Sequence, residues 1–188
     1  MTEPHLLYRI EGNIAILTIN RPEVKNTFSP EMLTLWRQFV EEAKADHNVR
    51  VIIVTGKGDT FCSGGDIREM AEGRLRSWDM KKFLWEGVHR IIFALEDLDK
   101  PVIAAINGAA MGAGLDMTIM CDLRVCSDRA KLSESYILMG LVPGDGGAFF
   151  LQRLIGIGKA LELLFTGDVL SPQEALEIGL VNRVVSHD

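Results

Sequence analysis

Two aspartates stand alone in otherwise uncharged stretches of the sequence. Asp116 is the only charged residue in the stretch 101–121, and Asp145 is the only one in the stretch 135–152. Burying an unpaired charge is expensive, so each carboxyl must be solvated, paired or functional. An apolar environment raises the proton affinity of a carboxyl toward the range used in general acid and base catalysis. Both aspartates are therefore catalytic candidates, the alternative being that each caps a helix or a turn.

Two turns rich in small residues, Ser63-Gly64-Gly65 and Gly112-Ala113-Gly114, could stabilise negative charge. Each lies where a strand is expected to lead into a helix. The first N–H groups of a helix have no partner within the helix and carry partial positive charge. Two such turns that face one cavity would hold an oxyanion between two backbone donors. Tight turning and close helix packing explain the same glycines without any chemistry.

Other catalytic motifs are absent from the sequence. The turn at Gly112 lacks the third glycine of a dinucleotide fingerprint, and Lys57 is followed by Gly58 where a Walker loop needs Ser or Thr. There is no GxSxG elbow, and His89, on a predicted helix, is interpreted as a surface or satisfied histidine. Since no His or Cys spacing indicates a metal site, we expect neither a metal nor a redox cofactor.

The composition is that of one soluble domain. The 188 residues are 47% hydrophobic and 24% charged, with a formal net charge of −6. With no basic run in the sequence, nucleic acid is not expected as a partner. The N-terminus lacks the pattern of a signal peptide, and the three cysteines, Cys62, Cys121 and Cys126, cannot all pair with one another. We therefore expect a cytoplasmic protein with a single domain over residues 1–188.

Hydrophobic periodicity predicts the elements that position these residues. A hairpin is expected over 6–20 and a helix from the N-cap Ser29 through about Asp46. Further on, the pattern predicts a strand over 49–55, a helix over 79–98, a strand over 102–106, a helical segment over 115–120, a strand over 123–126, helical stretches over 148–164 and 172–178, and a last strand over 181–185. Alternating strands and helices indicate an α/β domain.

The stretch 101–121 is long enough to cross a membrane and holds a single charge. Its proline, its asparagine, its three glycines and Asp116 favour a buried strand followed by a helix. No membrane association is therefore expected.

Four segments together resemble the crotonase, or enoyl-CoA hydratase/isomerase, superfamily. They are FCSGGDIREM (61–70), KPVIAAINGAAMGAGLDMTIMCDLRV (100–125), GLVPGDGGAFFLQRLIG (140–156) and TGDVLSPQEALEIGLVNRVV (166–185). The early loop NRPEVKN (20–26) is also similar to that family. The resemblance implies a spiral of repeated ββα units, assembly into a homotrimer or hexamer, and an acyl-CoA thioester as substrate.

The resemblance assigns roles to particular residues. The N–H groups of Gly65 and Ala113 would form the oxyanion hole for a thioester enolate, and Asp116 matches the first catalytic carboxylate of the family. Asp66 and Ile67 would line the CoA moiety, and Arg21 or Lys25 would meet its phosphates.

The sequence departs from the family where hydratases carry a second glutamate. Tyr136 stands at that position and is expected to be part of the substrate site. Asp145 is then the most plausible replacement for the second catalytic carboxylate, with Glu134 as a weaker candidate. This departure leaves enolate chemistry intact and makes water addition by two glutamates less secure.

Three functions stay open at this point. Hydration of an enoyl-CoA or dienoyl-CoA thioester is favoured, with double-bond isomerisation close behind. The third is a crotonase-fold protein that binds acyl-CoA or serves a structural role without turnover. The family also carries helices after the position of Val185, so the chain is expected either to be truncated or to have those helices supplied or replaced elsewhere.

Overall fold

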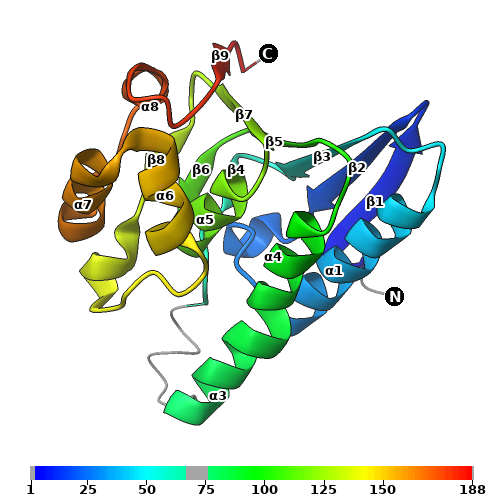
Figure 1. Ribbon diagram of the computed structural model, residues 1–188, viewed down its shortest axis with the longest axis horizontal. Coiled ribbons are helices and arrows are strands. Elements are labelled where there is room, and N and C mark those ends of the chain that lie inside the picture. Colours follow the sequence, from blue (N-terminus) through cyan, green and yellow to red (C-terminus); the bar gives the residue numbers. More distant parts are fainter. Residues whose placement is uncertain (1–2, 67–75, 188) are drawn as a thin grey trace.

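Two sheets organise the fold. The computed structural model describes residues 3–66 and 76–187. Among these residues, the larger sheet has six strands in the order β1-β2-β3-β5-β7-β9, and the smaller sheet has three in the order β4-β6-β8 (Figure 1). In chain order the strands are β1 (Leu6–Glu11), β2 (Ile14–Ile19), β3 (Val51–Gly56), β4 (Thr60–Cys62), β5 (Val102–Ile106), β6 (Ala109–Met111), β7 (Leu123–Ser127), β8 (Lys131–Ser133) and β9 (Arg183–Val185).

Successive strand pairs give the fold its repeat. Strands β3, β5 and β7 run parallel in the larger sheet. Each is followed by one strand of the smaller sheet, so β4, β6 and β8 also run parallel. After β6 the chain enters α5 (Ala113–Ile119) at once. This is the ββα repeat that the resemblance implied, and the predicted fold class is confirmed.

Helices cover the sheets and complete the core. They are η1 (Pro22–Val24), α1 (Pro30–Ala45), α3 (Ser77–Phe83), the π-helical segment η2 (Leu84–Val88), α4 (His89–Glu96), η3 (Ser135–Met139), α6 (Gly147–Ile155), α7 (Ile157–Thr166) and α8 (Pro172–Glu177). Figure 1 shows α1 and α4 side by side near the β1–β2 end of the larger sheet, with α6 and α7 at the opposite side of the molecule. Trp36 of α1, Ile52 of β3, and Leu115 and Met117 of α5 are fully buried in the core.

Most predicted elements agree with the structure. The short helix η3 was not predicted, the helix expected after the Ser63-Gly64-Gly65 turn lies outside the described residues, and three further differences have physical reasons. The strands of the smaller sheet were missed because each has three residues, and β4 and β6 lie within glycine-rich turns. The helix predicted over 79–98 begins at Ser77 and contains the π-helical segment. The stretch predicted over 148–164 is divided at Gly156, whose φ of 79° ends α6.

The stretch 101–121 folds as the two strands β5 and β6 followed by the helix α5. Within the described part of the chain, no helix combines the length and apolar character needed to cross a membrane.

The backbone of α5 lies directly against β4. A side chain at Gly114 would place its Cβ 2.1 Å from the carbonyl oxygen of Cys62. A Cβ at Gly108 would likewise lie 2.0 Å from the carbonyl oxygen of Asp59. Glycine is required at both positions because neither backbone neighbour can move aside without disturbing the smaller sheet. These contacts set the position of the first turn of α5, which carries Ala113 and Asp116.

We predict that Gly114→Ala destabilises the fold by about 1–3 kcal/mol, the usual cost of overpacking a tight contact. Gly158→Ala in α7 is the matched control, because a Cβ there meets no atom of the described residues within 4 Å. That control should be neutral or stabilising by up to about 1 kcal/mol, since alanine favours helix more than glycine does. Urea unfolding of the three proteins measures both effects, and equal midpoints for Gly114→Ala and the unmodified chain would contradict the prediction.

Candidate active site

A mostly apolar cavity of about 500 Å³ lies beside the N-terminus of α5. Its walls come from the two glycine turns, from α3 and η2, and from η3 with the loop 140–146 that follows. The lining residues are Phe28, Ser63, Gly64, Gly65, Met80, Phe83, Leu84, Met111, Gly112, Ala113, Ser135, Tyr136, Leu138, Met139, Leu141, Val142, Gly144 and Asp145. The cavity therefore combines two polar features, the backbone amides of the glycine turns and the phenol of Tyr136 with the carboxyl of Asp145, within a mostly apolar lining.

The early loop holds the first glycine turn against this cavity. The N–H and the Oγ of Ser63 both donate to the carbonyl oxygen of Lys25, at 3.1 and 2.9 Å, and the N–H of Phe28 donates to the carbonyl of Gly64 at 2.8 Å. Lys25 and Asn26 have a left-handed backbone, with φ of 56° at each. The buried amide of Asn26 supports that conformation by donating to the carbonyls of Lys57 and Thr60.

The second glycine turn presents an amide at the start of a helix. Ala113 is the first residue of α5, after Gly112 with a φ of 51°. Its N–H has no carbonyl of its own helix to donate to. Ala113 and Gly65 both line the cavity, so the structure brings the two predicted oxyanion donors to one space.

Tyr136 joins the two predicted catalytic carboxyls. Its Oη lies 2.6 Å from Oδ2 of Asp116 and 2.8 Å from Oδ2 of Asp145. Asp145 is 5% exposed and lines the cavity with Tyr136, whereas Asp116 is 0% exposed and lies behind them. Asp116 fits there because Gly147 has no side chain, since a Cβ at that position would lie 2.3 Å from Oδ1 of Asp116.

Burial sets the protonation of the site. It raises the pKa of Asp116 to about 7, opposed by the hydrogen bond from Tyr136 and reinforced by the charge of Asp145. It also raises the pKa of Asp145, opposed by the hydrogen bond from Tyr136 and by the nearby His89. A carboxyl with a pKa near neutrality can both take up and release a proton during a reaction.

Glu134 adds a third buried carboxyl to this cluster. It is 1% exposed, and neither of its carboxyl oxygens has a hydrogen-bond partner among the described residues. Burial, followed by the charge of Asp116, raises the pKa of Glu134 to about 10. Glu134 is therefore neutral at pH 7, and it does not line the cavity.

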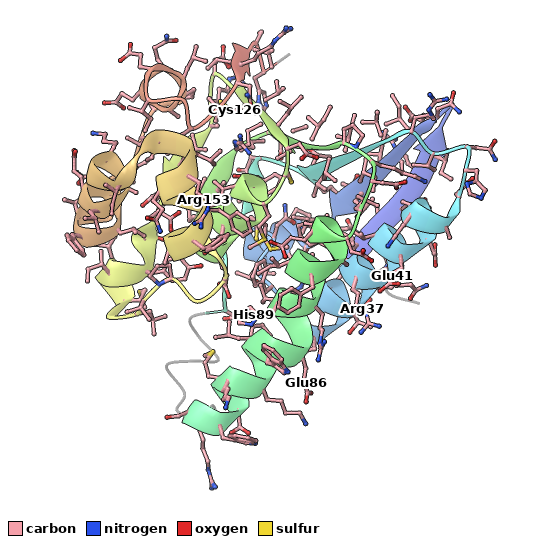
Figure 2. All side chains as sticks on the ribbon, in the orientation of Figure 1. Arg37, Glu41, Glu86, His89, Cys126 and Arg153 are labelled. Atoms are coloured by element: carbon pink, nitrogen blue, oxygen red, sulfur yellow. The ribbon has the colours of Figure 1, made fainter. Side chains whose placement is uncertain are left out.

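His89 holds the loop that carries Asp145. Its Nε2 donates to the carbonyl oxygen of Gly144 at 2.8 Å. Figure 2 labels His89 at the start of α4, and its hydrogen bond to Gly144 ties α4 to the loop that leads into α6. No sequence motif surrounds this histidine, and the contact joins positions 55 residues apart, so it could not be predicted from a local pattern.

The remaining predicted residues lie at the edge of the site or away from it. Lys25 is exposed and pairs with Asp59 at 3.3 Å instead of lining the cavity. The guanidinium of Arg21 donates to the carbonyls of Thr27 and Phe28, a structural role within the early loop. Asp66 is partly buried next to Gly65, and Ile67 lies outside the described residues. The proposed contacts of Lys25, Asp66 and Ile67 with CoA stay predictions.

A larger groove of about 920 Å³ lies between α1 and the α3–η2 helix, but its chemistry differs. Its charged residues include Arg37, Glu41 and Glu86, labelled in Figure 2. Arg37 pairs with Glu41 at 3.4 Å, and all three side chains are more than half exposed. No group of three or more metal-ligating side chains occurs in the described part of the chain. We therefore take the smaller cavity, with its buried acids, as the candidate active site.

Known proteins resemble this chain over nearly all of its length. It is 40% identical over 176 residues to a short-chain-enoyl-CoA hydratase of Clostridium acetobutylicum, covering 93% of this chain and 66% of the relative. It is 35% identical over 181 residues to a trans-2-decenoyl-[acyl-carrier-protein] isomerase of Streptococcus mutans, and this match covers 95% of this chain and 68% of the relative. The structure of an enoyl-CoA hydratase from Bacillus anthracis superposes with a TM-score of 0.92 at 33% identity, and the superposition covers 97% of this chain and 70% of that one.

The chain thus spans about two thirds of the length of these relatives. The model of the enoyl-CoA hydratase/isomerase family matches residues 9–188, which include both glycine turns and all the buried acids of the site. Together with the ββα repeat, these matches show that the chain belongs to the enoyl-CoA hydratase/isomerase family.

Proposed function

We propose that this protein hydrates the double bond of a 2-enoyl-CoA thioester through an enolate held by backbone amides. One observation carries the proposal. A single cavity holds the Ala113 amide at the start of α5, the Gly65 turn, and the pair of proton-carrying groups Tyr136 and Asp145. Those are the two requirements of enolate chemistry, a site for negative charge and an acid–base pair beside it.

The thioester would bind with its carbonyl oxygen on the N–H groups of Gly65 and Ala113. Negative charge then develops on that oxygen, where the N-terminus of α5 stabilises it. Asp145 would take a proton from the attacking water, and the cluster would return a proton to the α-carbon. The thioester itself supplies the acidity, so the reaction needs no metal or redox cofactor.

Double-bond isomerisation is the second candidate, and one observation favours it. The hydroxyl of Tyr136 lies between the two aspartates, 2.6 and 2.8 Å from their oxygens, in the position where a water shared by both carboxyls would otherwise sit. Without a water in that position, Tyr136 and the two aspartates would exchange protons directly with the substrate. The isomerase of Streptococcus mutans, at 35% identity, is consistent with this alternative.

The cavity wall favours an apolar acyl chain. Met80, Phe83 and Leu84 contribute from α3 and η2, and Leu138 and Met139 contribute from η3. Methionine and leucine side chains adapt to ligands of different shape at modest cost. We propose that this wall receives the acyl group while CoA extends past the Gly65 turn.

We also propose assembly into a homotrimer or hexamer and a cytoplasmic location. Large apolar side chains are exposed on η3, on the loop after it and on α7, which contacts η3: Leu138 (66%), Val142 (82%), Ile157 (64%) and Phe165 (71%). Exposed apolar patches of this kind mark interaction surfaces. Sedimentation of the purified protein tests the assembly.

We predict that Asp145→Asn lowers turnover about 10²–10⁴-fold, the usual worth of a general acid or base, and leaves thioester binding nearly unchanged. Crotonyl-CoA and a 3-enoyl-CoA are incubated with the protein in heavy water and the products followed by NMR. Water addition supports the hydratase, and a deuterated product with a moved double bond supports the isomerase.

The exposed Asp168→Asn, on the loop after α7, is the control and should match the unmodified protein. Binding without turnover or exchange for either substrate would instead support the non-catalytic reading of the fold. An unaffected Asp145→Asn would remove Asp145 from the mechanism.

We predict that Ala113→Pro lowers kcat about 10²–10³-fold, because it deletes one proposed oxyanion donor. Proline is well tolerated at the first position of a helix, where its missing N–H breaks no helical hydrogen bond. Steady-state kinetics and urea unfolding of the same preparation separate the two effects. A stable variant with unchanged kcat would rule out Ala113 as an oxyanion donor.

The burial of Glu134 also makes the stability of the fold depend on pH. The pKa of Glu134 is about 10 in the folded protein and near 4.5 when exposed, so the folded state binds its proton more tightly. The Glu134 contribution to the free energy of unfolding is therefore fully present below about pH 4.5 and declines as pH rises toward 10.

We predict that Glu134→Gln removes this decline, so that the variant gains stability relative to the unmodified protein as pH increases from 5 to 9. Urea midpoints at pH 5, 7 and 9 measure the difference, with the exposed Glu162→Gln in α7 as the control for glutamine itself. A constant difference between Glu134→Gln and the unmodified protein across this range would contradict the buried, neutral carboxyl.

A further inference from the structure

The hydroxyl of Tyr136 connects the buried carboxyl of Asp116 to the cavity. Tyr136 and Asp145 line the cavity wall, but Asp116 lies behind them with no exposed surface. The contact that links Asp116 to the wall is its 2.6 Å hydrogen bond with the phenol. Any proton that passes between Asp116 and a substrate by this link must therefore pass through Oη of Tyr136.

Counting hydrogens shows that this arrangement holds a shared proton. A phenol has one hydrogen and can donate one linear hydrogen bond. Yet Oη lies within hydrogen-bond distance of two carboxyl oxygens, at 2.6 and 2.8 Å. In the second contact the phenol oxygen must accept, which requires a hydrogen on that carboxyl. Asp116, Tyr136 and Asp145 together therefore hold two protons and one negative charge.

We propose that Tyr136 is a catalytic residue, a proton relay that exchanges a proton with the substrate at the cavity wall while Asp116 replaces that proton from behind. The proposal rests on the proposed function, since it names the group that meets the reacting atom. It also changes the role expected of Asp116 from direct contact with substrate to that of a proton reservoir.

Each step of the relay balances. At the start Asp116 carries a proton, Tyr136 carries its own and donates to Asp145, and Asp145 is ionised. Asp145 takes a proton from water or from a substrate carbon. In hydration, the O–H bond of Tyr136 breaks as a C–H bond forms at the enolate α-carbon, and the proton of Asp116 moves to the phenol oxygen. In isomerisation the same transfer forms the C–H bond at the α- or the γ-carbon of the dienolate, whichever did not lose its proton to Asp145.

The cycle ends with the negative charge on Asp116 and a proton on Asp145. The cluster then resets when the proton of Asp145 moves to Tyr136 and that of Tyr136 moves to Asp116, along the same two hydrogen bonds.

Tyr136 can work only as a relay and not as an isolated acid. Burial, followed by the negative charge that the two aspartates share, strongly raises the pKa of its phenol, so a phenolate between the two carboxyls is strongly disfavoured. Replacing the proton as it leaves avoids that phenolate. Among the described residues, the ionisable groups around this path are Asp116 from α5, Glu134 before η3, Asp145 from the loop before α6, His89 from α4 beyond Asp145, and the buried thiol of Cys62 from β4.

The kinetic test replaces the phenol with a ring of the same shape. We expect Tyr136→Phe to lower kcat at least about 100-fold with KM changed only a few-fold. Tyr8→Phe is the matched control, because Tyr8 is the other tyrosine of the chain and stacks on Phe39 at 5.0 Å outside the cavity wall. Asp116→Asn should lose a similar factor, and the double variant with Tyr136→Phe should be no slower than either single variant, since residues of one relay act as a unit.

A spectroscopic test needs no turnover. Aspartate labelled with ¹³C at the side-chain carboxyl separates the infrared bands of aspartates from that of Glu134. At pH 7 we expect the C=O stretch of a protonated aspartate in the unmodified protein, and its loss in both Asp116→Asn and Asp145→Asn.

The outcomes separate this proposal from the proposed function. Turnover of Tyr136→Phe within threefold of the unmodified protein, or aspartate bands that are all ionised at pH 7, would overturn the relay. If the unmodified protein binds enoyl thioesters without converting them, the proposed function fails and the catalytic role of Tyr136 fails with it. The infrared bands would still decide whether Tyr136 and the two aspartates share a proton.

Discussion

The structure depends on keeping three carboxyl groups and a phenol together in a space almost closed to water. Glu134, Asp116 and Asp145 are each 5% exposed or less. Three full charges at this depth would repel one another and lose their hydration, a cost far above the stability of an ordinary domain. The cluster is tolerable because two of the three carboxyls carry protons. The loss of hydration that makes charged carboxylates costly to bury also raises their pKa, so that they can exchange protons near neutral pH.

The architecture meets this constraint by bringing strand ends together. Each ββα unit directs one strand into each sheet, so the turns after β4 and β6 and the segment after β8 reach the same side of the smaller sheet. Close backbone contacts at glycines fix the first turn of α5, and His89 fixes the loop before α6. Groups far apart in the sequence thereby meet within hydrogen-bond distance, and the three cysteines, all within the described residues, form no disulfide that would hold them.

Much of this could be predicted from the sequence, and the reasons are physical. Isolated charges in apolar stretches identified Asp116 and Asp145, because such residues can be buried only at a cost that something must offset. Strand and helix periods identified the larger sheet and most helices. The smaller sheet was missed since a strand of three residues has too few alternations to show a period.

Contacts between distant segments were missed for a different reason. Tyr136 was placed in the substrate site, but its position between two aspartates depends on how η3 packs against α5, which no local pattern encodes. The same holds for His89 and for the burial of Glu134. Glu134 was considered only as a weaker substitute for a missing carboxylate, whereas its raised pKa makes it a neutral neighbour of the site.

The π-helical segment η2 joins α3, which lines the cavity, to α4, which packs in the core. One extra residue in a helical turn rotates everything before it by about 100° relative to everything after it. Before the segment, Met80 and Phe83 face the cavity, and after it Ile91 and Ile92 are buried in the core. The part of this helix that lines the cavity and the part that packs on the sheet are therefore set by different residues, so substitutions at Met80 or Phe83 can reshape the cavity without removing the core contacts of Ile91 and Ile92.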